Sequence, residues 1–250
     1  MKYKAIFIDV DGTLVPNASE DVPSKRVTDA ITKAREKGLH VGVVTGRPMK
    51  YLGEIFDHLN LEGPSIVVDG AQIVDSVTRK VLWEQPMTQE DIESVKKIVF
   101  QFVKRVFINE DGVDSHLVED GIYNKPLGMY IDSLPEDLAD KLIAALSNIP
   151  TIRVGKMVSW TTGQLDVWVS HNGATKQHGI QKAAEILKID TKEIIGIGDG
   201  YNDFPLMLAC GLKVAMGNAI EDLKAIADYV APTVQEDGVA DVIEKFVLNK

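Results

Sequence analysis

Residues 6–15 read IFIDVDGTLV, an apolar strand that runs directly into two aspartates and a glycine. The nearly continuous apolar run from Lys4 to Val10 is typical of a strand covered on both faces of a parallel sheet. A single aspartate would be enough to end such a strand. Asp9 and Asp11 are two residues apart, so their side chains share one face if the strand geometry persists that far. The pair therefore suggests chemistry at the carboxyl end of the strand.

Strands and helices alternate around this stretch. A helix is expected from Pro23 to Gly38, and the strand HVGVVTGRP (40–48), a helix over 49–59 and the strand SIVVDGA (65–71) follow it. This alternation predicts an α/β fold with a Rossmann-like, doubly wound parallel sheet. The same pattern resumes late in the chain with QLDVWVS (164–170), a helix over 174–187, EIIGIGDG (193–200), a helix through Met207, KVAM (213–216) and a last helix over 240–248.

Between these halves the pattern changes. Two amphipathic helices are expected near residues 91–102 and 135–146, among short strands of antiparallel character. The strands are RVFIN, GVDSHLV, LGMYID and MVSWTT. We therefore expect an α+β domain over residues 83–164, inserted into a parallel-sheet core formed by residues 1–82 and 165–250.

The composition of the chain argues against several classes of partner and site. The formal net charge is -10 over 250 residues, which disfavours nucleic acid and anionic membrane surfaces as partners. Cys210 is the only cysteine, which excludes a disulfide framework and a multi-cysteine zinc site. No stretch approaches the roughly 18 apolar residues of a membrane span. We expect a cytoplasmic protein that acts on small soluble ligands, and the sequence leaves open a homodimer formed through the insert.

Two of the predicted strand ends are acidic, and ligands of parallel sheets gather where the strands end. DVDGT contributes Asp9 and Asp11, and GDGYND contributes Asp199 and Asp203 around a glycine turn. The Thr13 hydroxyl can hold a carboxylate or the turn. Adjacent carboxylates repel, so either a metal ion lies there, or one carboxyl is protonated, or both occur in turn. Three or four converging carboxylates with waters make a hard oxygen site suited to Mg²⁺.

Two further strand ends carry groups that bind anions. VVTGRP offers the Thr45 hydroxyl, the Gly46 amide and the Arg47 guanidinium. Lys176 lies near the start of a predicted helix, where backbone N–H groups also favour an anion. An acidic cluster, a hydroxyl, a guanidinium and a lysine together describe a phosphate bound against a metal.

These segments resemble the four ordered motifs of the haloacid dehalogenase superfamily of phosphohydrolases. The large insert between the second and third motifs resembles the Cof-type branch with its type II cap domain. The tail DYVAPTVQEDGVADVIEKF (228–246) resembles the same branch. The motifs are Asp9-Val10-Asp11-Gly12-Thr13, then Thr45-Gly46-Arg47, then Lys176, then Gly198-Asp199-Gly200-Tyr201-Asn202-Asp203.

The resemblance implies an in-line attack by Asp9 on a phosphomonoester, giving an aspartyl-phosphate that water then hydrolyses. Asp11 would protonate the leaving alcohol and then deprotonate the water, while its backbone carbonyl binds Mg²⁺. Asp9 would bind the metal through its side chain, Asp199 would complete the metal shell, and Asp203 would be a further or indirect ligand. The implied contacts to the phosphoryl group and the substrate come from Thr45, Gly46, Arg47, Lys176 and Asn202.

Two positions depart from the usual pattern of the branch. Asp69-Gly70-Ala71 stands where the branch usually has Asn-Gly-Ala, and Gln177 rather than glycine follows Lys176. An Asp69 side chain that points into the site would disfavour strongly anionic leaving groups. Neither change removes a catalytic group.

The leading hypothesis is a Mg²⁺-dependent phosphatase of small phosphorylated metabolites, with sugar phosphates as the expected substrates and the cap excluding bulk water. A phosphomutase would use the same core and would need a bisphosphate activator. A signalling receiver has no use for Asp11 or for an inserted cap. A catalytically silent phosphosugar-binding module has no need of Asp9 and Asp11 together, and true dehalogenation lacks a role for the second aspartate.

Overall fold

The computed structural model describes residues 2–17, 22–110, 113–118, 120–158 and 163–249. The chain forms two compact units, one from Met1–Trp83 with Thr175–Lys250 and one from Glu84–Ala174. Each unit contains a sheet with its own hydrophobic core. The expected class is confirmed: an α/β parallel sheet with an inserted segment that combines antiparallel strands and helices.

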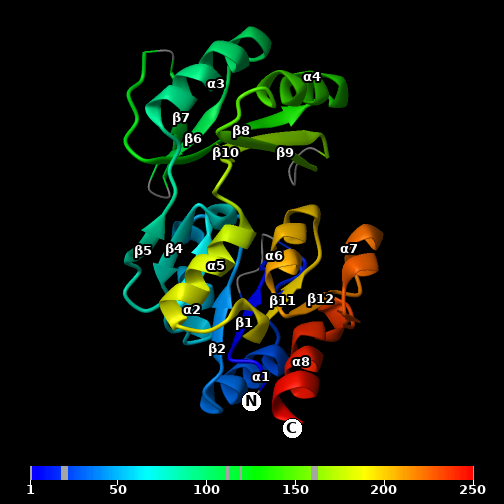
Figure 1. Cartoon of the computed structure of the whole chain (residues 1–250). Helices are drawn as coiled ribbons and strands as arrows, with labels where there is room; N and C mark the ends of the chain where they lie inside the picture. Colours follow the sequence, from blue (N-terminus) through cyan, green and yellow to red (C-terminus); the bar gives the residue numbers. More distant parts are fainter. Residues whose placement is uncertain (1, 18–21, 111–112, 119, 159–162, 250) are drawn as a thin grey trace. The chain divides into compact units, whose positions relative to one another are not determined.

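The first unit is built on a parallel five-stranded sheet in the order β13-β12-β11-β1-β2 (Figure 1). Strand β1 (Ala5–Ile8) is fully buried and pairs with β11 (Ile194–Gly198) on one side and β2 (His40–Val43) on the other. Strands β12 (Leu212–Ala215) and β13 (Tyr229–Val230) complete the sheet. Because parallel strands end at one edge, the residues that follow β1 and β11 are delivered to the same place.

Helix α1 (Lys25–Glu36) forms where the sequence predicts it. The Ser24 Oγ caps the helix by accepting from the Val27 N–H at 3.2 Å, and Gly38 follows the helix with a φ of +84°. Its buried face is made of Val27, Ala30, Ile31 and Ala34. The other helices of this unit are α2 (Gly53–His58), α5 (Lys176–Leu187), α6 (Phe204–Ala209), α7 (Glu221–Ile226) and α8 (Gly238–Ile243), followed by a π-helical turn over Glu244–Leu248.

The third predicted strand departs from the parallel sheet. Strand β3 (Pro64–Val67) is joined to that sheet by an isolated parallel bridge between Val44 and Ile66, but it pairs along its whole length with β4 (Gln72–Asp75) in antiparallel fashion. Strand β5 (Val81–Glu84) completes a sheet in the order β3-β4-β5. The prediction that SIVVDGA is a third parallel strand is therefore wrong in its main pairing, because a turn over Val68–Gly70 reverses the chain.

His40, at the start of β2, is a half-buried titratable group of the first unit. Its Nε2 lies 3.0 Å from the Pro64 carbonyl oxygen, and its ring centroid lies 5.4 Å from that of Phe7. Burial lowers the pKa of His40 to about 4, although the contact with Pro64 opposes this shift. Between pH 6.5 and 4 the unfolded chain therefore binds a proton that the folded chain does not.

The stability of the fold should fall as the pH drops through this window. We expect His40 to contribute about 3 kcal/mol of unfolding free energy at pH 7 that is lost by pH 4. Urea unfolding of wild type and His40→Gln at pH 4.5, 5.5 and 7 measures this, and the unfolding free energy of the wild type minus that of the variant should fall steadily as the pH drops. A difference that does not change with pH would show that His40 is not the titrating group.

The second unit contains an antiparallel five-stranded sheet in the order β7-β6-β8-β10-β9. Helices α3 (Gln89–Phe102) and α4 (Glu136–Leu146) cover one face of this sheet (Figure 1). The predicted helices and antiparallel strands are confirmed in the described residues, where MVSWTT contributes only Met157 and Val158 to a strand. Its residues 159–162 and residue 112 of GVDSHLV lie outside the described residues. The strands are β6 (Phe107–Glu110), β7 (Val113–His116), β8 (Pro126–Leu134), β9 (Ile152–Val158) and β10 (Leu165–His171).

The strand QLDVWVS was expected in the parallel core, and this expectation is wrong. The segment forms β10, which pairs antiparallel with both β8 and β9, and the second unit extends to Ala174. Val167 and Val169 join the hydrophobic cluster beneath α3 and α4, whereas Trp168 and Ser170 alternate with them and face the opposite side. This alternation is typical of a half-covered antiparallel strand rather than of a parallel strand buried on both faces.

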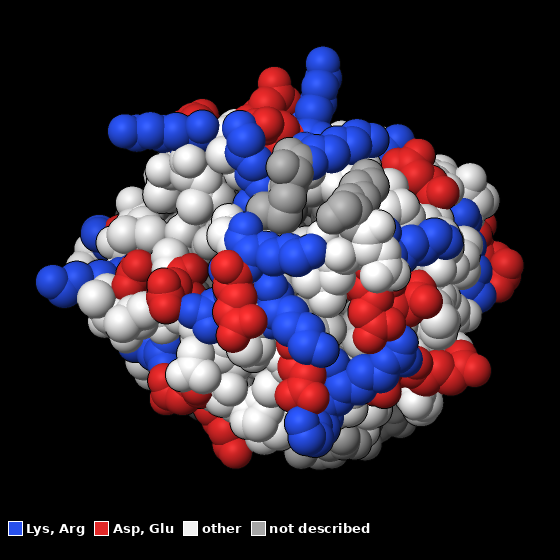
Figure 2. Space-filling view, turned by 90° about the horizontal axis from the view of Figure 1, so that it is seen from below, with Lys and Arg blue, Asp and Glu red and all other residues white. Residues whose placement is uncertain are grey.

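The surface carries charges of both signs. Figure 2 shows lysine and arginine side chains interspersed with aspartate and glutamate side chains over one face. Surface ion pairs of the first unit follow the same mixture, such as Arg26 with Glu244 and Lys25 with Asp29, each at 2.7 Å. Among the described residues, no helix has both the length and the apolar character needed to cross a bilayer.

Candidate active site

The turn after β1 lies against the end of β11. The Asp9 N–H donates to the Ile197 carbonyl at 2.9 Å, which continues the pairing of the two strands. Gly12 has a φ of +78°, and a Cβ at this position would overlap the Asp199 carboxylate. The Thr13 Oγ1 donates to Asp199 Oδ1 at 2.7 Å, so this hydroxyl holds a carboxylate, one of the two roles considered for it. The turn therefore needs glycine because Asp199 lies directly against it.

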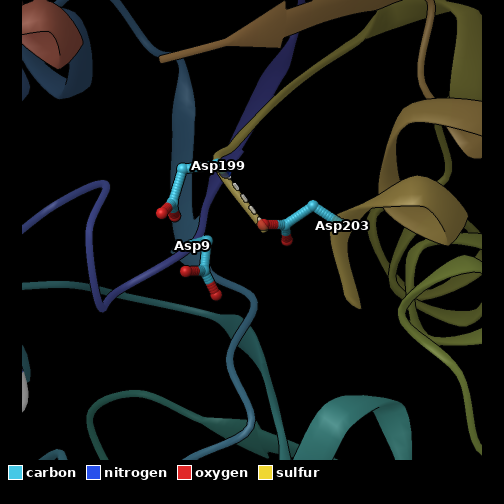
Figure 3. A group of neighbouring side chains, drawn as sticks. All are labelled: Asp9, Asp199 and Asp203. Atoms are coloured by element: carbon cyan, nitrogen blue, oxygen red, sulfur yellow. Dashed lines mark hydrogen bonds between the residues drawn. The ribbon is translucent and has the colours of Figure 1, made fainter. Parts of the chain in front are cut away.

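Asp9, Asp199 and Asp203 form a carboxylate cluster (Figure 3). Each side chain offers one oxygen, and these oxygens all lie within 4.8 Å of one another. Asp9 follows β1, Asp199 follows β11, and Asp203 ends the short 3₁₀ turn Tyr201–Asp203. The Asp203 Oδ2 accepts the N–H groups of Asp199 at 2.9 Å and Gly200 at 3.0 Å, which fixes this turn. Two strand ends far apart in the sequence thus supply one cluster.

Lys176 lies between two of these carboxylates. Its Nζ donates to Asp9 Oδ1 at 2.6 Å and to Asp203 Oδ1 at 2.7 Å, and its side chain has no exposed surface. Lys176 is the first residue of α5, and the Thr175 Oγ1 caps this helix by accepting the His178 N–H at 3.2 Å. The start of α5 therefore fixes the position of the ammonium group.

Burial and mutual charge shift the titration of the cluster. Burial raises the pKa of Asp9 well above its usual range, which the charge of Lys176 opposes and the charge of Asp203 reinforces. Burial likewise raises the pKa of Asp199 to about 6. Burial favours a lower pKa for Lys176, but the charges of Asp203 and Asp9 outweigh burial and hold this pKa above its usual range. Lys176 is therefore protonated. Its single positive charge does not balance the negative charges of the three carboxylates.

The donor set fits a small divalent cation. Three carboxylates face a single buried ammonium, so the cluster carries excess negative charge that burial penalises. Carboxylate oxygens at this spacing suit Mg²⁺, a hard cation that prefers oxygen ligands. Both oxygens of Asp203 already accept hydrogen bonds. Asp9 and Asp199 therefore have oxygens that could hold such a cation directly, whereas Asp203 holds Lys176 and the turn.

The Asp11 carboxylate pairs with Arg47. The Arg47 Nε donates to Asp11 Oδ2 at 3.0 Å and the Nη2 donates to Asp11 Oδ1 at 2.7 Å. The exposed fractions of the two side chains are 10% for Arg47 and 18% for Asp11. The sequence assigned Arg47 to the substrate and Asp11 to proton transfer, and both roles stay predictions. In the structure Arg47 donates one hydrogen bond to each oxygen of Asp11.

The loop from Thr45 to Arg47 is held from two sides. Thr45 is buried, and its Oγ1 accepts the Arg47 N–H at 3.1 Å. The carbonyls of Thr45 and Arg47 accept the N–H groups of Asp69 at 2.9 Å and Val68 at 3.2 Å. A Cβ on Gly46 would meet no neighbouring atom, so this residue leaves open space beside the loop.

The turn Val68–Gly70 is strained. Val68 has a φ of 49°, Asp69 a φ of 53° and Gly70 a φ of 102°, and a β-branched residue rarely adopts a positive φ. A Cβ on Gly70 would overlap the Thr175 carbonyl, so the turn also packs against the start of α5. This single turn therefore joins the loop that carries Thr45 to the helix that carries Lys176.

Asp69 faces the candidate site. The Asn202 Nδ2 donates to Asp69 Oδ1 at 3.4 Å, and the charge of Asp69 is among the causes that raise the pKa of Lys176. The sequence left the direction of this side chain open. Asn202, predicted as a substrate contact, thus lies beside the carboxylate that distinguishes this chain from the usual Asn-Gly-Ala pattern.

The sequence reasoning missed Asn218. Its Nδ2 donates to the Gly12 carbonyl at 2.8 Å, and its Oδ1 accepts the Val234 N–H at 2.9 Å. Asn218 therefore ties the turn after β1 to a distant segment of the first unit. The signal was present, since Asn218 closely follows the strand KVAM, and polar residues at strand ends identified the other site groups.

The chain belongs to the family of haloacid dehalogenase-like hydrolases. The family model matches residues 6–121 and 115–243, which include all four motifs and the whole insert. The resemblance inferred from the sequence is thereby confirmed.

Individual relatives and solved structures extend this match over nearly the whole chain. The putative phosphatase YxeH of Bacillus subtilis (strain 168) is 27% identical over 99% of this chain and 100% of its own length. The 5-amino-6-(5-phospho-D-ribitylamino)uracil phosphatase YcsE of the same organism is 28% identical over 98% of this chain and 96% of its own. The solved structure of the HAD subclass IIB sugar phosphatase BT4131 has a TM-score of 0.79 at 26% identity, covering 97% of this chain and 98% of that chain.

Proposed function

We propose that the chain is a Mg²⁺-dependent phosphatase that hydrolyses phosphomonoesters of small metabolites, sugar phosphates foremost, through an aspartyl-phosphate on Asp9. The observation that carries this proposal is the buried Asp9 carboxylate, held by Lys176 within a cluster of two further carboxylates. Relatives named as phosphatases, including a sugar phosphatase and a ribitylaminouracil phosphatase, support it. In this proposal the first unit is the catalytic core and the second unit is the type II cap.

In the first step Lys176 holds Asp9 Oδ1, which leaves Oδ2 to attack the phosphorus atom. A bond forms between Asp9 Oδ2 and phosphorus while the bond from phosphorus to the leaving oxygen breaks, and that oxygen takes a proton from Asp11. The Thr45 hydroxyl and the Lys176 ammonium donate hydrogen bonds to the phosphoryl oxygens as charge spreads over them. Asp9 and Asp199 would hold Mg²⁺, which would supply positive charge to offset the negative charge of the cluster and of the phosphoryl group.

In the second step Asp11 takes a proton from a water molecule whose oxygen attacks the phosphorus atom. The bond between phosphorus and Asp9 Oδ2 breaks, which releases inorganic phosphate and restores the Asp9 carboxylate. Arg47 releases Asp11 in both steps. The phosphoryl group is the natural acceptor for the released guanidinium, because arginine binds phosphate through the same two-pronged geometry.

The test of this function is phosphate release from a panel of sugar phosphates and p-nitrophenyl phosphate, with Mg²⁺ and with EDTA. We expect turnover that needs Mg²⁺ and returns when the metal is restored. A phosphomutase would instead give an isomeric phosphate ester and would depend on a bisphosphate. Saturable binding of phosphosugars without release of phosphate from any ester would identify a silent binding module and overturn the proposal.

Replacement of Asp11 by asparagine tests the role of the leaving-group acid. For a sugar phosphate, whose alkoxide needs a proton to leave, we expect kcat to fall by about 10²- to 10⁴-fold. p-Nitrophenolate leaves without a proton, so the first step on p-nitrophenyl phosphate should be much less affected. Rapid-mixing measurements should then show a burst close to one p-nitrophenol per chain before slow turnover. Equal losses on both esters without a burst would contradict the assignment.

A further inference from the structure

The sheet of the second unit carries aromatic rings on the face opposite α3 and α4. His116, Phe107, Tyr130 and Trp168 occupy paired positions on β7, β6, β8 and β10, and we call them the aromatic row. The ring centroids of Phe107 and Tyr130 are 4.7 Å apart with planes 11° apart, and those of Phe107 and His116 are 4.8 Å apart. Phe107, Tyr130 and Trp168 are only partly buried.

Trp168 on β10 ends this row. Its ring occupies the space above Gly155, its partner on β9, where a Cβ would overlap the indole. The Arg153 guanidinium lies 4.4 Å from the Trp168 ring centroid, a cation–π contact. A guanidinium and an indole therefore stand together at one end of the row.

A polar row runs beside the aromatic row. Asn109 on β6 pairs with Gly128 on β8, and a Cβ on Gly128 would lie 3.9 Å from the Cβ of Ser170 on β10. Ser170 in turn pairs with Arg153 on β9. An amide, a hydroxyl and a guanidinium thus follow one another across the sheet, with a glycine that leaves space between the first two.

The Ser170 hydroxyl is the observation that points to a ligand. Ser170 is 8% exposed, and its Oγ has no hydrogen-bond partner among the described residues. A buried hydroxyl without a partner destabilises a fold, and native structures satisfy almost all such groups. Stacked aromatic pairs across strands stabilise an antiparallel sheet by themselves, but this explanation does not account for the Ser170 hydroxyl.

We propose that this face of the second unit binds a planar heterocyclic ring, which packs against the aromatic row and exchanges a hydrogen bond with the Ser170 hydroxyl. Flat rings stack on aromatic side chains with little dependence on their identity. In the polar row, Asn109 Nδ2 already donates to Asp114 Oδ1 at 2.7 Å and Arg153 Nη1 to the Ala174 carbonyl at 3.5 Å, so the Ser170 hydroxyl is the group that meets the edge of such a ring. The inference rests on the second unit alone and does not depend on the proposed phosphatase activity.

The test compares probes that carry a planar heterocyclic ring with one that does not, and the former are called ring-bearing probes. Uridine, adenosine and riboflavin are titrated against the full chain by saturation-transfer NMR, with D-ribose, whose only ring is saturated and puckered, as the control. None of these probes carries phosphate, so the result is independent of catalysis at Asp9. We expect at least one ring-bearing probe to bind tenfold or more tightly than D-ribose. If no ring-bearing probe binds more tightly than D-ribose, the proposal is overturned.

Two variants assign the binding to this face. Ser170→Ala should weaken binding of the ring-bearing probe about three- to tenfold while leaving thermal stability equal or higher, because it removes a hydroxyl without a partner. Tyr130→Leu should weaken binding about tenfold, and Tyr51→Leu, at an exposed tyrosine of the first unit, should not change it. Unchanged binding in both Ser170→Ala and Tyr130→Leu would overturn the proposal even if the ring-bearing probe binds elsewhere.

Discussion

The Asp9→Asn chain should release phosphate from any ester at least about 10⁴-fold more slowly than the wild type, because an amide cannot form the aspartyl-phosphate. The substitution keeps the size of the side chain, and the amide oxygen can still accept from Lys176. It also removes one of three clustered carboxylates that burial penalises. The metal-free variant should therefore be at least as stable as the metal-free wild type, and the loss of activity should not come from unfolding.

The measurement is steady-state phosphate release with saturating Mg²⁺, together with urea unfolding of both chains in EDTA. Asp29→Asn is the matched control, because Asp29 forms an exposed ion pair with Lys25 on α1. Its activity should equal that of the wild type. More than one hundredth of wild-type activity in Asp9→Asn would exclude Asp9 as the nucleophile.

The Lys176→Met chain should lose both activity and stability. Lys176 contacts Asp9 and Asp203, and all three side chains are buried. Removal of the ammonium leaves two carboxylates without their partner, and the breaking of buried ion pairs in this way costs about 3–5 kcal/mol. We expect a loss of this size in the unfolding free energy of the metal-free chain at pH 8, and a smaller loss at pH 5, where protonation of the carboxyls relieves the repulsion.

Urea unfolding at the two pH values checks this expectation. Lys182→Met on the same helix is the control, because Lys182 pairs with Glu185 at an exposed position and its loss should change stability by less than about 0.5 kcal/mol. Equal stability of Lys176→Met and Lys182→Met would contradict the arrangement of charges described for the cluster.

The parallel core was predictable because its inner strands are short apolar runs without alternation. The sequence failed at β3 and at β10 for two different reasons. Strand β3 is as apolar as a parallel strand, and only the backbone of Val68 and Asp69 reverses the chain after it. Strand β10 does alternate, but its position just before the next predicted helix suggested a core strand. In both places the local pattern therefore predicted a strand correctly but did not predict which strands it pairs with.

The carboxylate cluster was predictable because polar residues at the ends of adjacent parallel strands must meet. The partner of each side chain was not predictable. Arg47 pairs with Asp11, and Asn202 lies beside Asp69, because turn geometry and side-chain rotamers decide which neighbouring groups touch. The position of Asn218 after KVAM marks it as a candidate, but its bond to Gly12 depends on how a distant loop folds back, which the sequence pattern does not show.

The turn Val68–Gly70 couples the position of Thr45 to the position of Lys176, two residues with different chemical roles in the proposed mechanism. It bonds to the carbonyls of Thr45 and Arg47 on one side and packs against Thr175, the residue before Lys176, on the other. A side chain added at Gly70 would overlap the Thr175 carbonyl, and the same turn carries the bonds to Thr45 and Arg47. Substitutions at this turn should therefore be epistatic with substitutions at Thr45 and Lys176, and their effects should fail to add although none of these turn residues needs to touch a substrate.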